Sequence, residues 1–333
     1  MRSHLKRFLY HSGLLTLAGL ARSRRGALVL RYHAVTEGAG EVPYATPEIC
    51  IPVEGLRLQM AFVKRAYTVL PLHELVDLVR RGATLPPRAL AITFDDGYAD
   101  NHRLAFPVLR RLGLTATVYV ITGSLDGGPP PWVAAVRALV LGARGSELDV
   151  PGLPPIALGP AGQRGPAARA LTRALVPLGS GERTERLAAA ATAAGVDLTR
   201  ALAGVMLGWA QVRELAAAGW TIGAHTVTHP NLALAAPAEA EAEIAGSRDA
   251  IAAALGERPL HFAYPNSGGE HRYFDAAVAG VLRRLGFRSA AISKPGLVCP
   301  GTDPFTLPRL GVGPRLVPVS ELAAALARQR LAA

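Results

Sequence analysis

From Ala27 onward, short apolar runs alternate with segments of helical periodicity almost to the end of the 333-residue chain. Buried strands are predicted at residues 27–35, 88–94, 115–122, 220–226, 261–265, 287–293 and 306–312, and helices at residues 53–66, 73–81, 101–112, 210–218, 237–255, 274–285 and 320–332. We expect Ser320 to cap the last helix. Because each helix returns the chain to the same end of the sheet, successive strands pair in parallel. The pattern therefore predicts an α/β fold whose parallel sheet is open or closed into a barrel.

Residues 132–204 interrupt this alternation. The segment follows the sequence DGGPPP, is rich in Ala, Gly, Pro and Arg, and contains helical pieces without strand-like alternation. We interpret it as a helical insertion that divides the barrel into residues 27–131 and 205–333. Loop insertions in such folds often shape the binding cleft, and the alternative is a spacer without a role in binding.

The first 26 residues combine basic and apolar side chains. On a helix, Leu5, Phe8 and Leu9 would share an apolar side opposite a basic one, which indicates an amphipathic N-terminal extension on a membrane surface or on the barrel. This interpretation predicts a cytoplasmic or membrane-peripheral protein. The alternative is a signal peptide over residues 1–21, which would predict a secreted or periplasmic protein.

The formal charge of +11 comes almost wholly from arginine, because the chain has only three lysines. A basic surface favours anionic polymers or acidic membrane faces. No dense basic tract with interleaved aromatic residues occurs, so we do not expect nucleic acid as a partner. Cys50 and Cys299 belong to no paired motif, which argues against a disulfide framework or a zinc–thiolate site.

Polar residues gather at the C-terminal ends of three predicted strands, where active sites of parallel α/β folds collect. Asp95 and Asp96 end the first strand, His225 and His229 follow the second in AHTVTHPN, and residues 262–269 (FAYPNSGG) form the third site. Histidines four residues apart, together with a carboxylate, are typical ligands of a divalent ion with an open position. Such an ion would also remove the repulsion between the adjacent carboxylates. Each pattern alone also occurs by chance, in a solvated turn or a helix face.

TFDDGYADN followed by HTVTHPNL resembles the polysaccharide deacetylases with a NodB homology domain, the carbohydrate esterase 4 group. The resemblance extends from about residue 27 to about residue 312, outside the insertion. It implies a distorted (β/α) barrel that removes N- or O-acetyl groups from sugars. It also implies a divalent metal cofactor, with zinc expected and nickel, cobalt or manganese as alternatives.

Carried over by position, the resemblance assigns the metal centre to four residues: the general base Asp95 and the ligands Asp96, His225 and His229. Tyr264, Pro265 and Asn266 would form the side of the site that binds substrate and oxyanion. The backbone N–H of Asn266 is the expected oxyanion donor, because a backbone donor depends little on the side chain.

Two features depart from the family pattern. Ala263 stands where many members carry an Arg that supports the catalytic Asp, so we consider Arg31 and Arg309 as replacements that support Asp95. The C-terminal His that supplies the general acid is also absent. RYHAV resembles the N-terminal strand of a permuted subgroup similar to poly-N-acetylglucosamine deacetylases, which implies that His33 is the general acid. The alternative for His33 is a hydrogen-bonded core residue.

The expected activity is metal-dependent removal of N-acetyl groups from an N-acetylated glycan or a lipid-linked sugar of the cell envelope. The alternatives are hydrolysis of O-acetyl esters or another non-peptide amide, and a sugar-binding homologue without catalysis. Trp132 and Trp209, at the two ends of the insertion, are expected to pack rather than to stack on sugar. His102, His261 and His271 are expected to be structural or solvated.

Overall fold

The computed structural model describes residues 26–331 except 39, 161 and 267–270. The predicted N-terminal extension therefore lies outside the described residues, apart from Gly26. Among the helices that are described, none is both long enough and apolar enough to cross a membrane.

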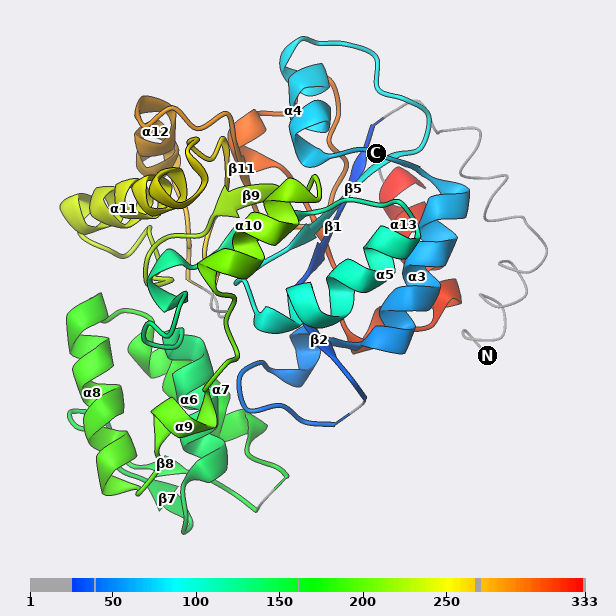
Figure 1. The fold of residues 1–333 in the computed structure, drawn as a ribbon. Helices are drawn as coiled ribbons and strands as arrows, with labels where there is room; N and C mark the ends of the chain where they lie inside the picture. The colour runs from blue at the N-terminus through cyan, green and yellow to red at the C-terminus, as the bar shows by residue number, and fades with distance from the viewer. Residues whose placement is uncertain (1–25, 39, 161, 267–270, 332–333) are drawn as a thin grey trace.

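A curled parallel sheet occupies the centre of the larger lobe in Figure 1. Its strand order is β11 (Ser289–Ala291), β10 (His261–Ala263), β9 (Thr221–Ala224), β6 (Thr117–Val120), β5 (Ala89–Phe94), β1 (Leu28–Tyr32) and β12 (Leu310–Gly311), and the short β4 (Thr68–Val69) also pairs with β5. Leu307, just before β12, forms a parallel bridge with Ala291. The last segment thus contacts both edges of the sheet, and the predicted distorted (β/α) barrel is confirmed.

Helices surround this sheet (Figure 1). They are α3 (Val53–Ala66), α4 (Leu72–Arg80), α5 (Phe106–Arg111), α10 (Trp209–Ala217), α11 (Pro237–Leu255), α12 (Ala276–Arg284) and α13 (Val319–Leu331). Gly219 (φ 85°) and Gly286 (φ 87°) follow α10 and α12 in the left-handed conformation, which ends a helix at no steric cost in glycine.

Side-chain alternation along the strands sets the two faces of the barrel wall. In β1, Leu28 and Leu30 join the core under the surrounding helices, whereas Val29 packs with small residues of β5, β10 and β11 and with α4. The same period of two carries on to Arg31, which pairs in register with Thr93 of β5. At the C-terminal ends of β1 and β5, the side chains that face the barrel interior are therefore polar.

The insertion forms a second lobe with its own hydrophobic core (Figure 1). It contains α6 (Trp132–Gly142), α7 (Gly165–Leu175), α8 (Ser180–Ala193) and α9 (Leu198–Ala201), together with an antiparallel pair, β7 (Glu147–Leu148) and β8 (Ile156–Ala157). The sequence did not predict this pair, because strands of two residues are too short to show alternation.

Three local predictions are wrong in detail. Residues 27–35 are two strands, because β1 ends at Tyr32 and β2 (Ala34–Thr36) pairs with β3 (Cys50–Pro52) in a separate sheet. Residues 101–112 begin as a π-helix (Asn101–Ala105) before α5, whose second residue is a proline without an N–H. Ser320 lies inside α13 and does not cap it, since the carbonyl of Pro318 already accepts the first helical N–H groups.

Candidate active site

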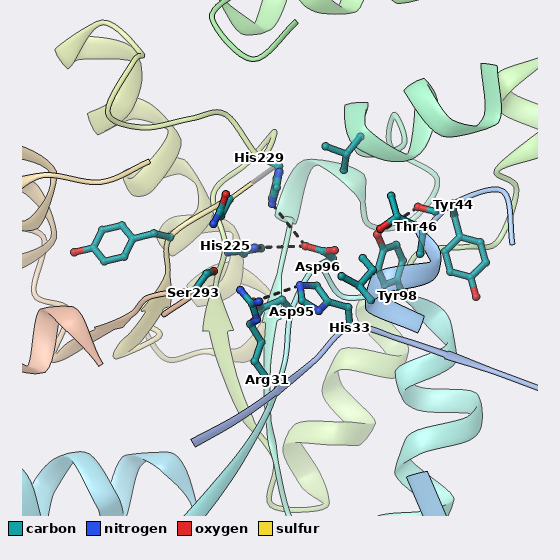
Figure 2. A pocket seen from close by; sticks show the side chains of 15 residues that line it. Arg31, His33, Tyr44, Thr46, Asp95, Asp96, Tyr98, His225, His229 and Ser293 are labelled. Carbon is teal, nitrogen blue, oxygen red and sulfur yellow. Dashed lines mark hydrogen bonds and ion pairs between the residues drawn. The ribbon is translucent and has the colours of Figure 1, made fainter. Parts of the chain in front are cut away.

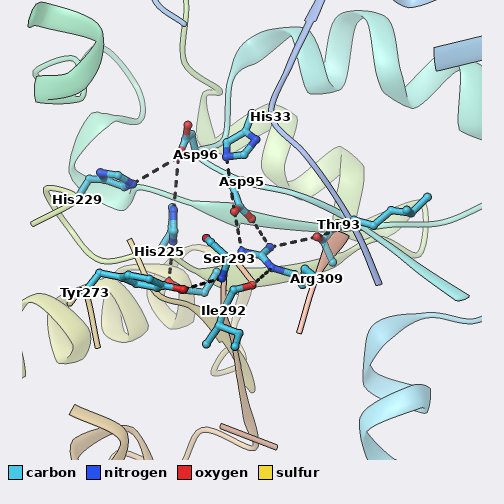
Figure 3. Close-up of polar contacts among 12 residues, drawn as sticks. His33, Thr93, Asp95, Asp96, His225, His229, Tyr273, Ile292, Ser293 and Arg309 are labelled. Atoms are coloured by element: carbon cyan, nitrogen blue, oxygen red, sulfur yellow. Dashed lines mark hydrogen bonds and ion pairs between the residues drawn. The ribbon is translucent and has the colours of Figure 1, made fainter. Parts of the chain in front are cut away.

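Asp96, His225 and His229 converge at the C-terminal ends of β5 and β9 (Figures 2 and 3). Asp96 Oδ1 lies 3.4 Å from Nε2 of His225 and 3.7 Å from Nε2 of His229, and the three donor atoms lie within 4.8 Å of one another. All three side chains are buried. Ligands about 2.0–2.2 Å from a tetrahedral ion are about 3.3–3.6 Å apart. The three residues therefore fit a divalent ion.

Their protonation states suit a cation as well. Nδ1 of His225 lies 2.7 Å from the carbonyl oxygen of Ala263 and donates its proton there, which turns Nε2 toward Asp96. Burial, together with His225, lowers the pKa of His229 to about 3, so this imidazole is neutral at neutral pH. Burial alone would raise the pKa of Asp96, but the hydrogen bond with His225 and the neighbouring histidines hold it well below its usual range.

The backbone at this centre is strained. Asp96 (φ 74°), Thr226 (φ 68°) and His229 (φ 62°) are three of the five described non-glycine residues with a positive φ. A β-branched residue such as Thr226 is rare in this conformation, which costs about 1–3 kcal/mol. Thr226 Oγ1 accepts a hydrogen bond of 3.0 Å from the backbone N–H of His229, which stabilises the turn between the two histidines. Such strain is typical of functional sites.

Asp95 is held by a bidentate ion pair with Arg309 (Figure 3). Arg309 Nη1 and Nη2 donate to the two carboxylate oxygens at 2.6 and 2.7 Å, and the guanidinium also donates to Thr93 Oγ1 and to the carbonyl of Ile292. Burial would raise the pKa of Asp95, but the charge and hydrogen bonds of Arg309, together with the neighbouring His33 and His225, outweigh burial and lower this pKa to about 2. Asp95 is therefore ionised at neutral pH.

Arg309 thus occupies the supporting role for which the sequence offered two arginines, and Arg31 does not share it. The guanidinium of Arg31 lines the cavity that also contains Asp95, but it makes no hydrogen bond to any described residue. Ala263 contributes only its carbonyl, which accepts from His225. The arginine that many family members carry at this position is replaced here by Arg309, which comes from a different strand end.

His33 lies at the break between β1 and β2, with Nε2 3.8 Å from Asp95 Oδ2. Its carbonyl accepts a 2.8 Å hydrogen bond from Nδ2 of Asn101, the first residue of the π-helix. Burial lowers the pKa of His33 to about 4, against the opposing charges of Asp96 and Asp95. No local pattern predicted the contact of Asn101 with His33, because the two residues are 68 positions apart.

These residues face a cavity of 260 Å³ (Figure 2). One wall is polar, and the other is formed by Tyr44, Ala45, Thr46, Ile49 and Val133. Asn266 is exposed at the cavity, and Pro265 is buried beside it. Tyr264 lines the cavity, but its hydroxyl donates to the carbonyl of Phe305 at 3.1 Å and so points into the core.

Trp132 connects the insertion to the metal centre. Its indole N–H donates to the carbonyl of His229 at 2.9 Å, and the guanidinium of the buried Arg183 lies 4.5 Å from its ring centroid. On the other side of the loop, Glu243 of α11 accepts the backbone N–H groups of Val227 and Thr228 at 2.8 Å. The insertion and α11 therefore hold the histidine loop between them.

Two histidines outside the cavity, His261 and His102, have structural contacts. His261 is buried and lies 2.9 Å from Ser289 Oγ, and His102 pairs with Glu214 at 2.7 Å. Neither residue lines the cavity, and His271 is exposed.

The sequence pattern of the polysaccharide deacetylase family matches residues 82–140 and 176–290, more than half of the chain. The chain belongs to the polysaccharide deacetylase family. YxkH of Bacillus subtilis (strain 168) is 28% identical over 98 residues, which are 29% of this chain and 32% of YxkH. The match thus spans about a third of that relative.

Solved deacetylases share the fold. "Streptococcus pyogenes deacetylase PplD in complex with acetate" superposes with a TM-score of 0.60 at 17% identity, over 92% of this chain and 99% of PplD. IcaB from Ammonifex degensii gives a TM-score of 0.57 at 20% identity, over 91% of this chain and 97% of IcaB. The family match of the sequence and the fold shared with these solved structures therefore agree.

Replacing Arg309 with Gln should raise the pKa of Asp95, because burial then acts without the opposing guanidinium. If turnover requires ionised Asp95, the acid limb of the pH–rate profile moves upward by about 1–3 pH units. Breaking the buried pair should also lower the free energy of unfolding by about 3–5 kcal/mol in urea titrations. Arg284→Gln, which removes an exposed arginine paired with Glu241, is the control. An acid limb that does not move would contradict this role of Arg309.

Trp132→Phe keeps an aromatic ring but removes the donor to the carbonyl of His229. We expect affinity for a divalent ion, measured by competition with a chelator, to fall about tenfold, because the histidine loop loses a buried hydrogen bond. Trp209→Phe, at the other end of the insertion, should leave the affinity unchanged. Equal affinities in the two variants would show that Trp132 only packs.

Proposed function

We propose that this protein is a metal-dependent hydrolase that removes N-acetyl groups from an N-acetylated glycan. The observation that carries the proposal is an ionised, immobilised Asp95 beside the Asp96–His225–His229 donor set, in one cavity. Family membership supports deacetylation of a sugar polymer, and the chemistry of the site supports an amide as the bond that is cleaved.

Two nitrogen donors and one carboxylate suit zinc better than a hard cation that prefers oxygen ligands only. Asp96, His225 and His229 would hold the ion, which when bound supplies a Lewis acid for the acyl oxygen and lowers the pKa of water. The adjacent Asp95 is engaged by Arg309 and leaves the ligand set to the other three residues.

Asp95 would accept the proton of the attacking water. Arg309 contacts both carboxylate oxygens, so the carboxylate cannot rotate away from the cavity. A general base must reach its proton within about one hydrogen bond, and a fixed carboxylate meets this condition without reorganisation. The backbone N–H of Asn266 remains the expected donor to the developing oxyanion.

His33 would deliver a proton to the departing nitrogen. The pKa of His33, about 4, lies above that of Asp95, about 2, and the two side chains are 3.8 Å apart. A proton that Asp95 takes from water can therefore pass to His33 across this short distance. From His33 it can pass to the leaving amine, which cannot depart as an anion.

The first test combines metal content with turnover. Asp95→Asn should retain metal, measured by elemental analysis of the purified protein, yet release acetate about 10²–10⁴-fold more slowly. Asp96→Ala should lose both metal and activity, because it removes a ligand. Acetate release near the normal rate by Asp95→Asn, from N-acetylglucosamine oligomers, would refute the general-base assignment.

The second test separates proton delivery from a structural role of His33. His33→Ala should lower turnover about 10²–10⁴-fold on an N-acetyl sugar and far less on an activated aryl acetate, whose leaving group needs no proton. Asn101→Ala, which removes the hydrogen bond to the His33 carbonyl, should produce a weaker version of the same difference. Equal losses on both substrates would mean that His33 only maintains the site.

A further inference from the structure

Arg31 is a cation in the wall of the catalytic cavity that no described residue pairs with. Its Nε is buried without a hydrogen-bond partner, and its guanidinium lies within hydrogen-bond or ion-pair distance of no described carboxylate. Figure 2 shows this side chain beneath Asp95 and His33. An arginine remains charged under all ordinary conditions, so the charge cannot be removed by losing a proton.

The acids of the cavity cannot neutralise Arg31, because both are engaged elsewhere. Among the described lining residues, Asp95 and Asp96 are the only acids. Asp95 uses both oxygens for Arg309, and Asp96 faces His225 and His229. Burial and the charge of Arg309 both disfavour the protonated form of Arg31 and lower its pKa. Leaving this partly buried cation unpaired is costly, and such a cost is typical of a binding site.

The fold makes room for this guanidinium. Arg31 pairs in register with Gly311 of β12, and a Cβ on Gly311 would lie 2.9 Å from Nη2 of Arg31. The backbone of Gly311 does not have a positive φ, so its conformation does not require glycine. A side chain at Gly311 would therefore require the Arg31 guanidinium to move from its present position.

We propose that Arg31 binds an anionic oxygen group, a carboxylate or a phosphate, that the substrate carries on or beside the acetylated sugar. This proposal rests on the proposed deacetylase function and adds that the substrate is an acidic glycan. The planar guanidinium matches the paired oxygens of such a group, and the hydroxyl-bearing Ser293 lines the same cavity. Arg31 and Arg309 balance the two aspartates, so a bound divalent ion leaves the cavity positive.

The test compares three probes: a neutral N-acetylglucosamine oligomer, the same oligomer with 6-phosphate groups, and an N-acetylmuramic acid oligomer that carries carboxylates. For Arg31→Gln, KM for the acidic probes should rise about tenfold or more relative to KM for the neutral probe. Arg31→Lys should restore part of the preference, since it keeps the charge without the planar fork. Arg284→Gln, an exposed arginine far from the cavity, is the control and should change neither KM.

Gly311→Ala provides an independent variant. It should displace the Arg31 guanidinium and reduce the preference for acidic over neutral probes. In an Arg31→Gln background it should add little, because both substitutions remove the same interaction. Equal loss on acidic and neutral probes would overturn the proposal and indicate a structural Arg31. If Arg31→Gln is inhibited more weakly by acetate but keeps the ratio of KM for acidic and neutral probes, the proposal would also be overturned. Arg31 would then bind the released acetate.

Binding separates this proposal from the proposed function. If the metal-loaded protein releases acetate from none of the probes, the proposed function fails. Calorimetric titration with the acidic and neutral probes still measures whether Arg31→Gln removes a preference for the anionic group. A wild-type protein that binds both kinds of probe equally would overturn the proposal about Arg31.

Discussion

The bidentate ion pair between Arg309 and Asp95 joins the segment that closes the barrel to an acidic residue of the candidate site. Its partners are 214 residues apart and meet only because the segment that begins at Leu307 contacts both edges of the sheet. Each charge is buried, so each depends on the other, and loss of either would leave an uncompensated ion in the core. The same contact keeps Asp95 ionised and its carboxylate fixed. Closure of the barrel and the fixed, ionised state of Asp95, the proposed general base, therefore depend on the same contact.

The candidate metal site depends on a loop under strain that is held from two sides. Thr226 and His229 adopt left-handed backbone conformations, which persist because surrounding contacts determine them. Glu243 binds the backbone N–H groups of the loop, and Trp132 binds the carbonyl of His229. Since Trp132 opens the insertion, this second lobe contributes to the geometry of the site, whatever else it contributes to substrate binding. A spacer without such contacts would not need a buried indole donor at its first helical residue.

Much of the architecture follows from local patterns in the chain. Strand and helix periodicities, the acidic pair after β5 and the two histidines after β9 depend on spacings of a few residues, which are visible in the sequence. The adjacent carboxylates and the four-residue histidine spacing therefore predicted a metal-ligand set that the fold brings within 4.8 Å. Breaks such as the one at His33 were not visible, because the apolar pattern continues from β1 into β2 while the pairing partner changes to β3.

Long-range geometry decided the rest. The sequence alone left Arg31 and Arg309 as equal candidates beside Asp95, since both stand near strand ends. Only the register of β12 against β1, together with the return to β11, brings Arg309 to Asp95 and leaves Arg31 over Gly311, paired with no acid among the described residues. Residue types and local spacing are encoded in short stretches, whereas the pairing of charges across a barrel depends on how its strands close. The sequence by itself thus determined the kind of site, and the tertiary structure decided which arginine pairs with Asp95 and which lines the cavity without such a partner.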